Sequence, residues 1–307
     1  MVHASNHDAE VQMEYDLAGQ LLAEQTHSHG DIAVLRHTYD ELGNRTSTVL
    51  PDGRVLNHLF HGSGHLHQIN IDGDVVSDFE RDGIYRETSR TQGALTSQFR
   101  NDEAGRLADQ RAASAAASVI ARSYQYDAVG NLLTLDDSRI GRLSFDYDVI
   151  GRILGAVQQQ LAERFAFDPA HNIVDPAVAG GRVEANRVTV FEDKHYRYDP
   201  HGNVMEKLVG SHTRMQFEWN GAHQLVKSAV ARGDTLQKTR YVYDPFGRRI
   251  AKHDAFGATR FVWDGNRLLC EIRGGACRTS LYEPGSFARQ RVSKNRPVEQ
   301  GMAYEKD

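Results

Sequence analysis

Aromatic side chains stand two positions apart in many short segments of the chain, and each segment ends in one recurring phrase. Examples of such pairs are Tyr124 with Tyr126, Phe145 with Tyr147 and Tyr241 with Tyr243. A spacing of two places both rings on the same face of a β-strand, because side chains alternate across the pleat. The pattern therefore predicts β-strands that each carry a pair of rings on one face.

The phrase that follows is an aromatic residue, Asp, two variable residues, Gly, a polar residue and an aliphatic one. Its clearest copies contain Tyr15, Asp16, Gly19; Tyr39, Asp40, Gly43; Tyr126, Asp127, Gly130; Tyr147, Asp148, Gly151; Tyr198, Asp199, Gly202; and Tyr243, Asp244, Gly247. Degraded copies begin at Phe60, Phe79, Phe99, Phe167, Trp219 and Trp263, the last with Asp264. Most intervals between the aromatic residues are 19 to 24 residues, and the outliers are 27 and 31. Such a series indicates an internal repeat.

Each phrase predicts a turn between two strands. The Asp carboxylate can accept hydrogen bonds from backbone N–H groups two or three residues further on. Gly supplies the positive φ with which the chain re-enters a strand, and Pro169, Pro200 and Pro245 fit the position directly after Asp in a type I turn. The residue after Gly, such as Asn203 or Arg248, is expected to point outward. We therefore interpret the repeated residues as structural turn residues of a β-hairpin.

One hairpin of about 20 residues is only marginally stable alone, so the repeats must stack. The sequence thus predicts an all-β fold of about twelve stacked antiparallel hairpins in one long curled sheet. We assign residues 1–10 to an N-terminal extension, 11–287 to the repeat strip and 288–307 to a polar, mobile tail. Two stretches explain the long intervals: Ala112–Ser118, for which we favour an exposed loop, and Asp175–Gly181.

Composition narrows the class of protein. The 307 residues are 40% hydrophobic with a net charge of −5, which is typical of a globular chain. No run approaches the roughly 18 apolar residues of a membrane span, and the acidic balance argues against nucleic acid as a partner. The N-terminus lacks the basic and apolar regions of a signal peptide. We therefore expect the bacterial cytoplasm before export, or secretion by a route that needs no signal peptide.

Candidate chemistry is sparse, and we predict no catalytic, metal or cofactor site. His58, His61, His65 and His67 could meet across a hairpin, but no Cys or carboxylate completes a zinc ligand set, so a non-ligand role is favoured. Cys270 would lie diagonal to Cys277, and free thiols are favoured over a disulfide. The repeated Asp residues could suggest paired carboxylates, yet turn capping already explains them. For the basic cluster of Arg248, Arg249, Lys252 and Arg260 we favour cross-strand pairing over nucleic-acid binding.

The phrases resemble the RHS/YD repeats of rearrangement-hotspot (Rhs) proteins, which teneurins and insecticidal toxin-complex proteins share. The resemblance covers roughly residues 10–287 and is sharpest in Tyr241–Lys252, Phe261–Leu269 and Leu281–Phe287. It implies a β-strip wound into a hollow cocoon that encloses a C-terminal toxin until delivery. Bacterial members of the family are polymorphic toxins of type VI or related secretion systems, used in competition between bacteria.

The chain departs from the full family pattern. It has no recognisable N-terminal targeting domain, no Asp-Pro-x-Gly-Leu junction after Phe287 and no toxin domain beyond it. We therefore expect a non-enzymatic segment of shell whose partners are a polypeptide cargo or the remaining shell. Two alternatives stay open at this point: a surface module that binds glycans or proteins through its aromatic ladders, and a non-functional remnant of a larger gene.

Overall fold

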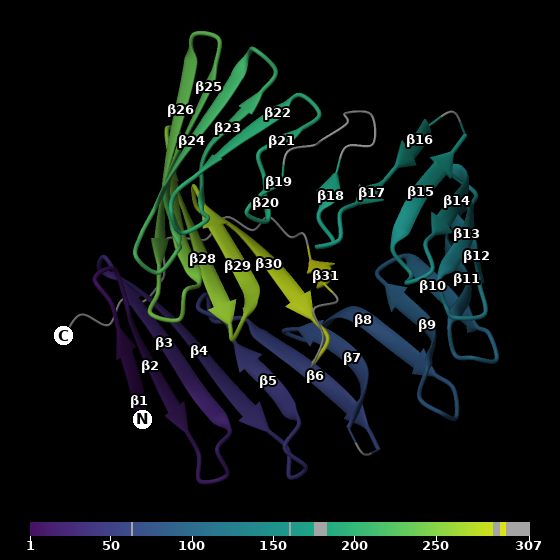
Figure 1. Cartoon of the computed structure of the whole chain (residues 1–307). Coiled ribbons are helices and arrows are strands. Elements are labelled where there is room, and N and C mark those ends of the chain that lie inside the picture. The colour runs from purple at the N-terminus through teal and green to yellow at the C-terminus, as the bar shows by residue number, and fades with distance from the viewer. Residues whose placement is uncertain (63, 160, 175–182, 285–288, 293–307) are drawn as a thin grey trace. The chain divides into compact units, whose positions relative to one another are not determined.

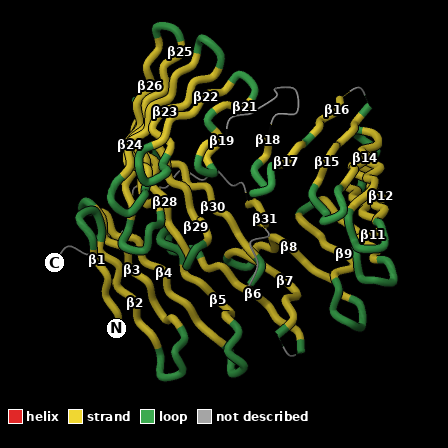
Figure 2. The backbone as a smooth tube through the Cα atoms, in the orientation of Figure 1, coloured by secondary structure: helices red, strands yellow, loops and turns green. Residues whose placement is uncertain are grey.

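The computed structural model describes residues 1–62, 64–159, 161–174, 183–284 and 289–292, and these residues form β-strands, turns and no helix (Figure 2). No helix with the length and apolar character needed to cross a membrane occurs in the described residues. The predicted all-β fold of stacked antiparallel hairpins is confirmed. The residues 175–181, to which we attributed the longest interval, lie outside the described residues, as does Gly285–Phe287.

The first long sheet contains sixteen strands, which are hydrogen-bonded in chain order (Figure 1). Its strands are β1 Val2–Ser5, β2 Glu10–Tyr15, β3 Leu21–Ser28, β4 Asp31–Tyr39, β5 Arg45–Val49, β6 Val55–His61, β7 His65–Ile71, β8 Asp74–Arg81, β9 Glu87–Gln92, β10 Leu95–Asn101, β11 Leu107–Ser114, β12 Ser118–Tyr126, β13 Leu132–Asp137, β14 Gly141–Tyr147, β15 Ile153–Gln158 and β16 Leu161–Arg164. Residues 1–10, assigned to an extension, thus include β1, which pairs antiparallel with β2.

The second long sheet contains eleven strands, and two short two-stranded sheets lie between the long ones in sequence. The short sheets are β17 Ala166–Phe167 with β18 Ile173–Val174, and β19 Val183–Glu184 with β20 Arg187–Val188. The long one contains β21 Val190–Phe191, β22 Lys194–Tyr198, β23 Val204–Val209, β24 Thr213–Trp219, β25 Leu225–Arg232, β26 Thr235–Tyr243, β27 Arg249–Asp254, β28 Gly257–Asp264, β29 Arg267–Arg273, β30 Ala276–Tyr282 and β31 Arg289–Val292. The strip expected as one sheet is therefore interrupted between β16 and β21, in the region of the longest interval.

Two expectations about loops and tails differ from the structure in detail. The expected exposed loop at Ala112–Ser118 is shorter than predicted, because Ala112–Ser114 belong to β11 and Ser118 begins β12, so that only the exposed residues 115–117 lie between the strands. Ala112 is buried, and the long interval is taken up by longer strands instead. Within the assigned tail 288–307, Arg289–Val292 forms β31 and pairs with β30.

A β-bulge recurs next to the aromatic residue of the repeat. The register shifts between Glu14 and Tyr15, between Gln125 and Tyr126 and between Val242 and Tyr243, among other copies. A bulge places two residues of one strand opposite one residue of its partner and increases the local twist. The repeat thus includes a regular source of sheet twist that the sequence pattern did not reveal.

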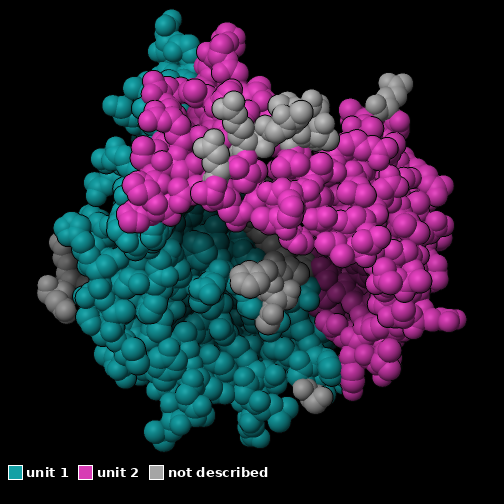
Figure 3. All heavy atoms as spheres, in the orientation of Figure 1, with its two compact units in different colours: residues 1–78, 215–307 teal, residues 79–214 magenta. Residues whose placement is uncertain are grey.

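The chain divides into two compact units, coloured separately in Figure 3: residues 1–78 with 215–307, and residues 79–214. Unit 1 has a core made by both of its chain segments. Val11, Leu35 and Ile69 of the first segment are buried, as are Val242 and Leu281 of the second. Two segments that are distant in sequence therefore pack together inside unit 1.

Unit 2 is built differently. In its described part, the buried hydrophobic residues are Phe79 and Ala112. The paired rings of Tyr124, Tyr126 and Phe145 lie on one sheet face and are only half-buried. The unit is therefore held together mainly along the sheet, by neighbouring hairpins, rather than by a second layer.

Candidate functional site

The repeated turn has the same hydrogen bonds in copy after copy. In the turn that starts at Asp127, Oδ1 accepts from the backbone N–H of Val129 at 3.0 Å and of Asn131 at 2.8 Å. The N–H of Gly130 donates to the carbonyl oxygen of Asp127 at 3.2 Å, and Gly130 has a φ of 99°. One carboxylate oxygen thus holds N–H groups two and four residues further on.

The structure places the predicted turn residues as follows. Tyr15, Tyr39, Tyr126, Tyr147, Tyr198 and Tyr243 are each the last residue of a strand. Each of Asp16, Asp40, Asp127, Asp148, Asp199 and Asp244 accepts the same pair of backbone bonds. Gly19, Gly43, Gly130, Gly151, Gly202 and Gly247 have positive φ. Trp263 and Asp264 instead both lie inside β28, and the Asp264 carboxylate binds Arg45.

The residue after Gly does not simply point outward. Asn131 Nδ2 donates to Asp127 Oδ2 at 2.8 Å, and Arg152 Nε donates to Asp148 Oδ2 at 2.6 Å. The expectation is wrong for Arg248, which is buried because its guanidinium is bound by acidic groups on both sides. The side chain after Gly therefore closes its own turn through the Asp carboxylate.

In many repeats the Tyr or Trp that ends a strand is hydrogen-bonded to the preceding hairpin. The hydroxyl of Tyr126 donates to the carbonyl oxygen of Leu107 at 2.9 Å, and the hydroxyl of Tyr147 to that of Leu132 at 2.9 Å. Trp263 Nε1 makes the equivalent bond. Other copies are formed by Tyr39, Tyr198, Tyr243 and Tyr282. We call this bond the hydroxyl stitch; it explains why the repeat favours Tyr or Trp over Phe at this position.

Successive turns also stack on one another. A Cβ added to Gly247 would lie 3.2 Å from Gln224 Nε2, a side chain of the preceding turn, and one added to Gly43 would lie 3.1 Å from Gln20 Nε2. Arg106 Nη1 donates to the carbonyl oxygen of Asp127 in the next turn at 3.1 Å. At Gly43 and Gly247, Gly is therefore needed both for its positive φ and for the close approach of the neighbouring turn.

Arginines of the turns and of the strands that follow them lie over rings of the strands. The guanidinium carbon of Arg106 is 4.8 Å from the ring centre of Tyr126, and that of Arg249 is 4.4 Å from Tyr241. A cation over a ring is stabilised by the negative face of the π system. Turn, ring and neighbouring hairpin thus form one connected unit, and this unit can extend a sheet but does not bring a nucleophile and a base together.

Unit 1 contains a second notable region, the contact between strands of its first segment and strands of its second, which we call the seam. Arg248 Nη2 lies 2.7 Å from Glu24 Oε1, and Arg248 Nε lies 2.5 Å from Asp244 Oδ2. All three side chains are buried, and burial raises the pKa of Glu24 although Arg248 opposes the rise. The seam is therefore fixed by buried charges as well as by apolar contacts.

Further polar contacts cross the seam. Arg45 donates two hydrogen bonds to the carboxylate of Asp264, at 2.7 and 2.6 Å. Arg54 Nη2 donates to Thr279 Oγ1 at 2.8 Å. Arg260 Nη1 lies 2.5 Å from Asp31 Oδ1. Within the predicted basic cluster, Arg248 and Arg260 thus pair with carboxylates of the other segment, and Lys252 lies 3.5 Å from Asp254.

The four clustered histidines do not converge on one point. His58 is buried in β6, whereas His61 and His67 are exposed. His61 and His65 are cross-strand partners in the β6–β7 pair. No group of three or more His, Cys, Asp or Glu side chains in the described residues is arranged to hold a metal ion.

The two cysteines are free and buried on neighbouring strands. Ile272 lies opposite Cys277 and Cys270 lies opposite Thr279, so the cysteines are diagonal to each other. A hydrogen bond from Cys270 lowers the pKa of Cys277 to about 7, and the same interaction together with burial raises the pKa of Cys270. Both sulfur atoms lie 3.9 Å from Thr279 Oγ1.

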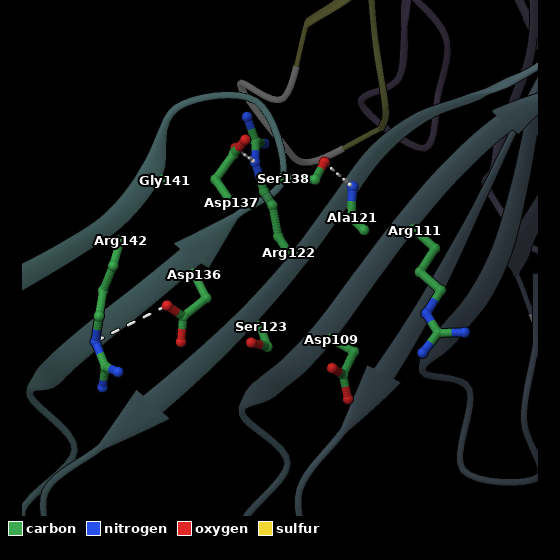
Figure 4. Close-up of a pocket in the computed structure, with 10 residues that line it drawn as sticks. All are labelled: Asp109, Arg111, Ala121, Arg122, Ser123, Asp136, Asp137, Ser138, Gly141 and Arg142. Atoms are coloured by element: carbon green, nitrogen blue, oxygen red, sulfur yellow. Dashed lines mark hydrogen bonds and ion pairs between the residues drawn. The ribbon is translucent and has the colours of Figure 1, made fainter.

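A charged cavity of about 370 Å³ lies over β11–β14 in unit 2 (Figure 4). Its acidic side chains are already matched by arginines: Arg122 Nε lies 2.5 Å from Asp137, and Arg142 Nε lies 3.8 Å from Asp136. Asp109 pairs with Arg100. Asp136 with Arg142 and Asp109 with Arg100 lie on one face of the sheet, and Arg122 with Asp137 lies on the other. The charged lining therefore consists of cross-strand ion pairs, which are ordinary on a sheet.

Comparison with known families agrees with this architecture. A family profile described as Teneurin YD-shell matches residues 74–265, and one described as RHS Repeat matches residues 15–55. The chain belongs to the RHS/YD-repeat family. The predicted resemblance is thereby confirmed.

The similar proteins include named toxins. The double-stranded DNA deaminase toxin A of Burkholderia cenocepacia is 38% identical over 294 residues, which are 89% of this chain and 20% of that protein. Toxin protein Tse5 of Pseudomonas aeruginosa is 29% identical over 334 residues, covering 94% of this chain and 25% of that protein. This chain thus spans a fifth to a quarter of these relatives.

Solved structures with the same fold include the Tc holotoxin pore of Photorhabdus luminescens. It has a TM-score of 0.60 at 12% identity and covers 92% of this chain and 18% of that one. The crystal structure of TcdB2-TccC3 has the same TM-score and identity, with coverage of 90% and 18%. At this identity the likeness establishes the fold.

Sequence reasoning missed the seam, although a signal for it was present. Two positions before the aromatic residue, the early repeats have Met13, His37, His58, Ser77 and Ser97, whereas repeats from Tyr124 onward have aromatic residues there. His37, His58 and Ser77 of unit 1 are buried, whereas Tyr124 of unit 2 is half-buried. Smaller or polar side chains at this position therefore mark where the face of the sheet is covered.

Proposed function

We propose that this chain is a wall segment of a toxin-enclosing shell and has no catalytic role of its own. The observation that carries the proposal is the hydroxyl stitch together with the stacked turns. Where the strand ends in Tyr or Trp, the hairpin is bonded in the same way to the one before it, so the repeat extends a sheet by similar steps. A repeat of this kind can build an extended sheet that serves as a wall.

Family membership and the named toxins among the relatives support this role. In those proteins the matched region is a fifth to a quarter of the length. The partner we propose is a polypeptide cargo, such as a toxin domain, or further shell segments. For location we propose the bacterial cytoplasm before export, with type VI or another signal-peptide-independent route as the way out.

Unit 2 offers a surface suited to a polypeptide cargo. Its ring-bearing face, which we define by Tyr124, Tyr126, Phe145 and Tyr147, is half-exposed. Aromatic side chains bury large apolar areas against extended or partly unfolded chains. The opposite face carries the ion pair of Asp136 with Arg142.

The test is co-expression of the full chain with a catalytically inactive toxin domain encoded beside its gene, followed by affinity purification and protease challenge. We expect the toxin domain to copurify and to be digested at least about tenfold more slowly than alone. The variant Phe145→Ser on the ring-bearing face should weaken this protection, whereas Arg142→Ser on the opposite face should not. If the toxin domain neither copurifies with the chain nor is protected from the protease, the shell role is refuted.

A further inference from the structure

The seam of unit 1 contains two buried histidines whose ring nitrogens are incompletely bonded. His37 of β4 is 4% exposed and His58 of β6 is 8% exposed. His37 Nδ1 lies 2.9 Å from Thr48 Oγ1, whereas its Nε2 has no hydrogen-bond partner in the described residues, and the same holds for Nδ1 of His58. Each ring is thus accommodated in its neutral form.

The charges around these rings are mostly positive. Arg45 of β5 acts on both histidines, and Arg267 of β29 also faces His58. Asp264 of β28 is the carboxylate that acts on both, and it is already held by the two hydrogen bonds from Arg45. A proton on either histidine would therefore add a positive charge to a buried site that has an excess of cations.

The remaining neighbours do not supply a compensating negative charge. Thr48 is neutral, Phe60 stacks obliquely on His58 at 6.4 Å, and the backbone of Tyr282 from β30 hydrogen-bonds His58. Tyr39 hydrogen-bonds Arg45. Among the described residues, Asp264 is the carboxylate whose charge acts on both rings, and it is shared with Arg45.

We propose that the seam is an acid-sensitive latch: protonation of His37 and His58 releases β28–β30 from the sheet that contains β4–β6 and uncovers the face carrying these histidines. The electrostatics agree with this geometry. Burial, followed by the charge of Arg45, lowers the pKa of His37 to about 4 and that of His58 to about 4. An unfolded histidine titrates near 6.5, so the open state binds more protons between about pH 6.5 and 4. Acidification through this window therefore favours opening.

The latch does not depend on the cargo or on the shell role. It concerns only the contact between residues 1–78 and the strands that follow residue 215. When the latch opens at acidic pH, the face of the first segment that carries His37 and His58 becomes accessible. When the latch is closed, the chain's own strands β28–β30 cover this face.

Trp263 is a suitable reporter, because it packs against the buried cluster of Ala9, Val242 and Ile250 at the seam. The chain has two Trp residues, so the full chain with Trp219→Phe reports Trp263 alone. We expect its emission to shift to longer wavelength on acidification, with a midpoint between about pH 6 and 4. A transition confined to pH values below about 3.5, where only carboxylates titrate, would overturn the proposal.

Non-titrating variants provide the decisive comparison. His37→Gln with His58→Phe should keep the seam closed and move the midpoint at least about one unit lower, because the two acid-titrating rings are gone. The matched control is His61→Gln with His67→Gln, which removes two exposed histidines from the β6–β7 hairpin that contains His58 and should leave the midpoint unchanged. Equal midpoints in both double variants would overturn the latch.

A second measurement covers the case in which the double variant does not fold. NMR titration of the histidine Cε1–H signals in the unmodified chain reports protonation of each ring directly. His37 and His58 should stay neutral until the Trp263 transition begins and should protonate together with it. Titration of either ring near pH 6.5 without a change at Trp263 would refute the proposal.

Discussion

Replacing Arg248 by methionine removes the one cation that two buried carboxylates of the seam share. Methionine keeps most of the apolar stem, so the change isolates the guanidinium. In the native chain this group donates to Asp244, to Glu24 and to the carbonyl oxygen of Gly265 at 3.0 Å. Because the three charged side chains are at most 7% exposed, water cannot replace the lost partner.

The expected cost follows from the protonation of Glu24. Burial raises the pKa of Glu24 above its ordinary value of 4.5 even with Arg248 in place, and removal of the guanidinium raises it further. Each further unit of pKa costs about 1.4 kcal/mol of stability at a pH above the new value. Truncating one member of a buried ion pair elsewhere costs about 3–5 kcal/mol.

The sign of the pH dependence is a second, independent expectation. A carboxyl whose pKa is higher in the folded than in the unfolded state stabilises the fold below its unfolded pKa and loses that stability as the pH rises. The deficit of Arg248→Met relative to the native chain should therefore grow between pH 5 and pH 7. Adding Glu24→Gln should recover about 2 kcal/mol at pH 7, because the amide needs no proton.

Urea unfolding followed by tryptophan fluorescence measures this effect, because both Trp219 and Trp263 belong to unit 1. The control is Arg260→Met, which removes an ion pair to Asp31 across the same seam. The side chains of Arg260 and Asp31 are 42% and 43% exposed, so we expect this variant to lose less than about 1 kcal/mol of stability. Equal losses in the two variants, or an Arg248→Met deficit that does not change with pH, would refute the reasoning.

Three further outcomes are expected. Tyr147→Phe removes one hydroxyl stitch and should cost about 1 kcal/mol in urea unfolding followed by circular dichroism; Tyr15→Phe, whose hydroxyl is at the surface, should cost under about 0.5 kcal/mol. Gly247→Ala should cost about 1–2 kcal/mol of stability, since φ is 81° and the added Cβ would lie 3.2 Å from Gln224 Nε2 of the preceding turn. Gly83→Ala, whose Cβ would have nothing within 4 Å, should change stability little in the same assay. The side-chain amide of Asn44 holds the pKa of Asp40 below 3.8 in the folded chain. The contribution of this turn to stability should therefore persist at pH 4 and be lost only as the pH falls through the lowered pKa of Asp40. A carbon NMR titration of Asp40 with a midpoint at or above 3.8 would contradict this.

Local chemistry explains what could be predicted from the sequence. The hairpin turn is specified within five residues, because Asp127 bonds groups two and four positions ahead and Gly130 supplies the positive φ. The pleat fixes that Tyr124 and Tyr126 share a face. Repetition of these signals was therefore enough to predict the all-β class and the stacked hairpins.

The contacts between hairpins could be predicted from the sequence only in part. That Tyr is preferred over Phe at the end of the strand pointed to a use for the hydroxyl, but only the structure identifies its acceptor in the preceding hairpin. The polar residue after Gly was misjudged for Arg248, because its exposure depends on Glu24, which is more than two hundred positions away.

By itself, the sequence determined the repeat unit, its turns and the ring-bearing face, because these depend on interactions over a few residues. Only the tertiary structure decided which parts of that face are covered. Arg45 and Asp264 are 219 positions apart and carry no local mark of their pairing. Their contact depends on how bulges and twist add up over many strands, and a small change per strand moves a distant segment by many ångströms. The buried surroundings of His37 and His58 follow from that accumulated geometry.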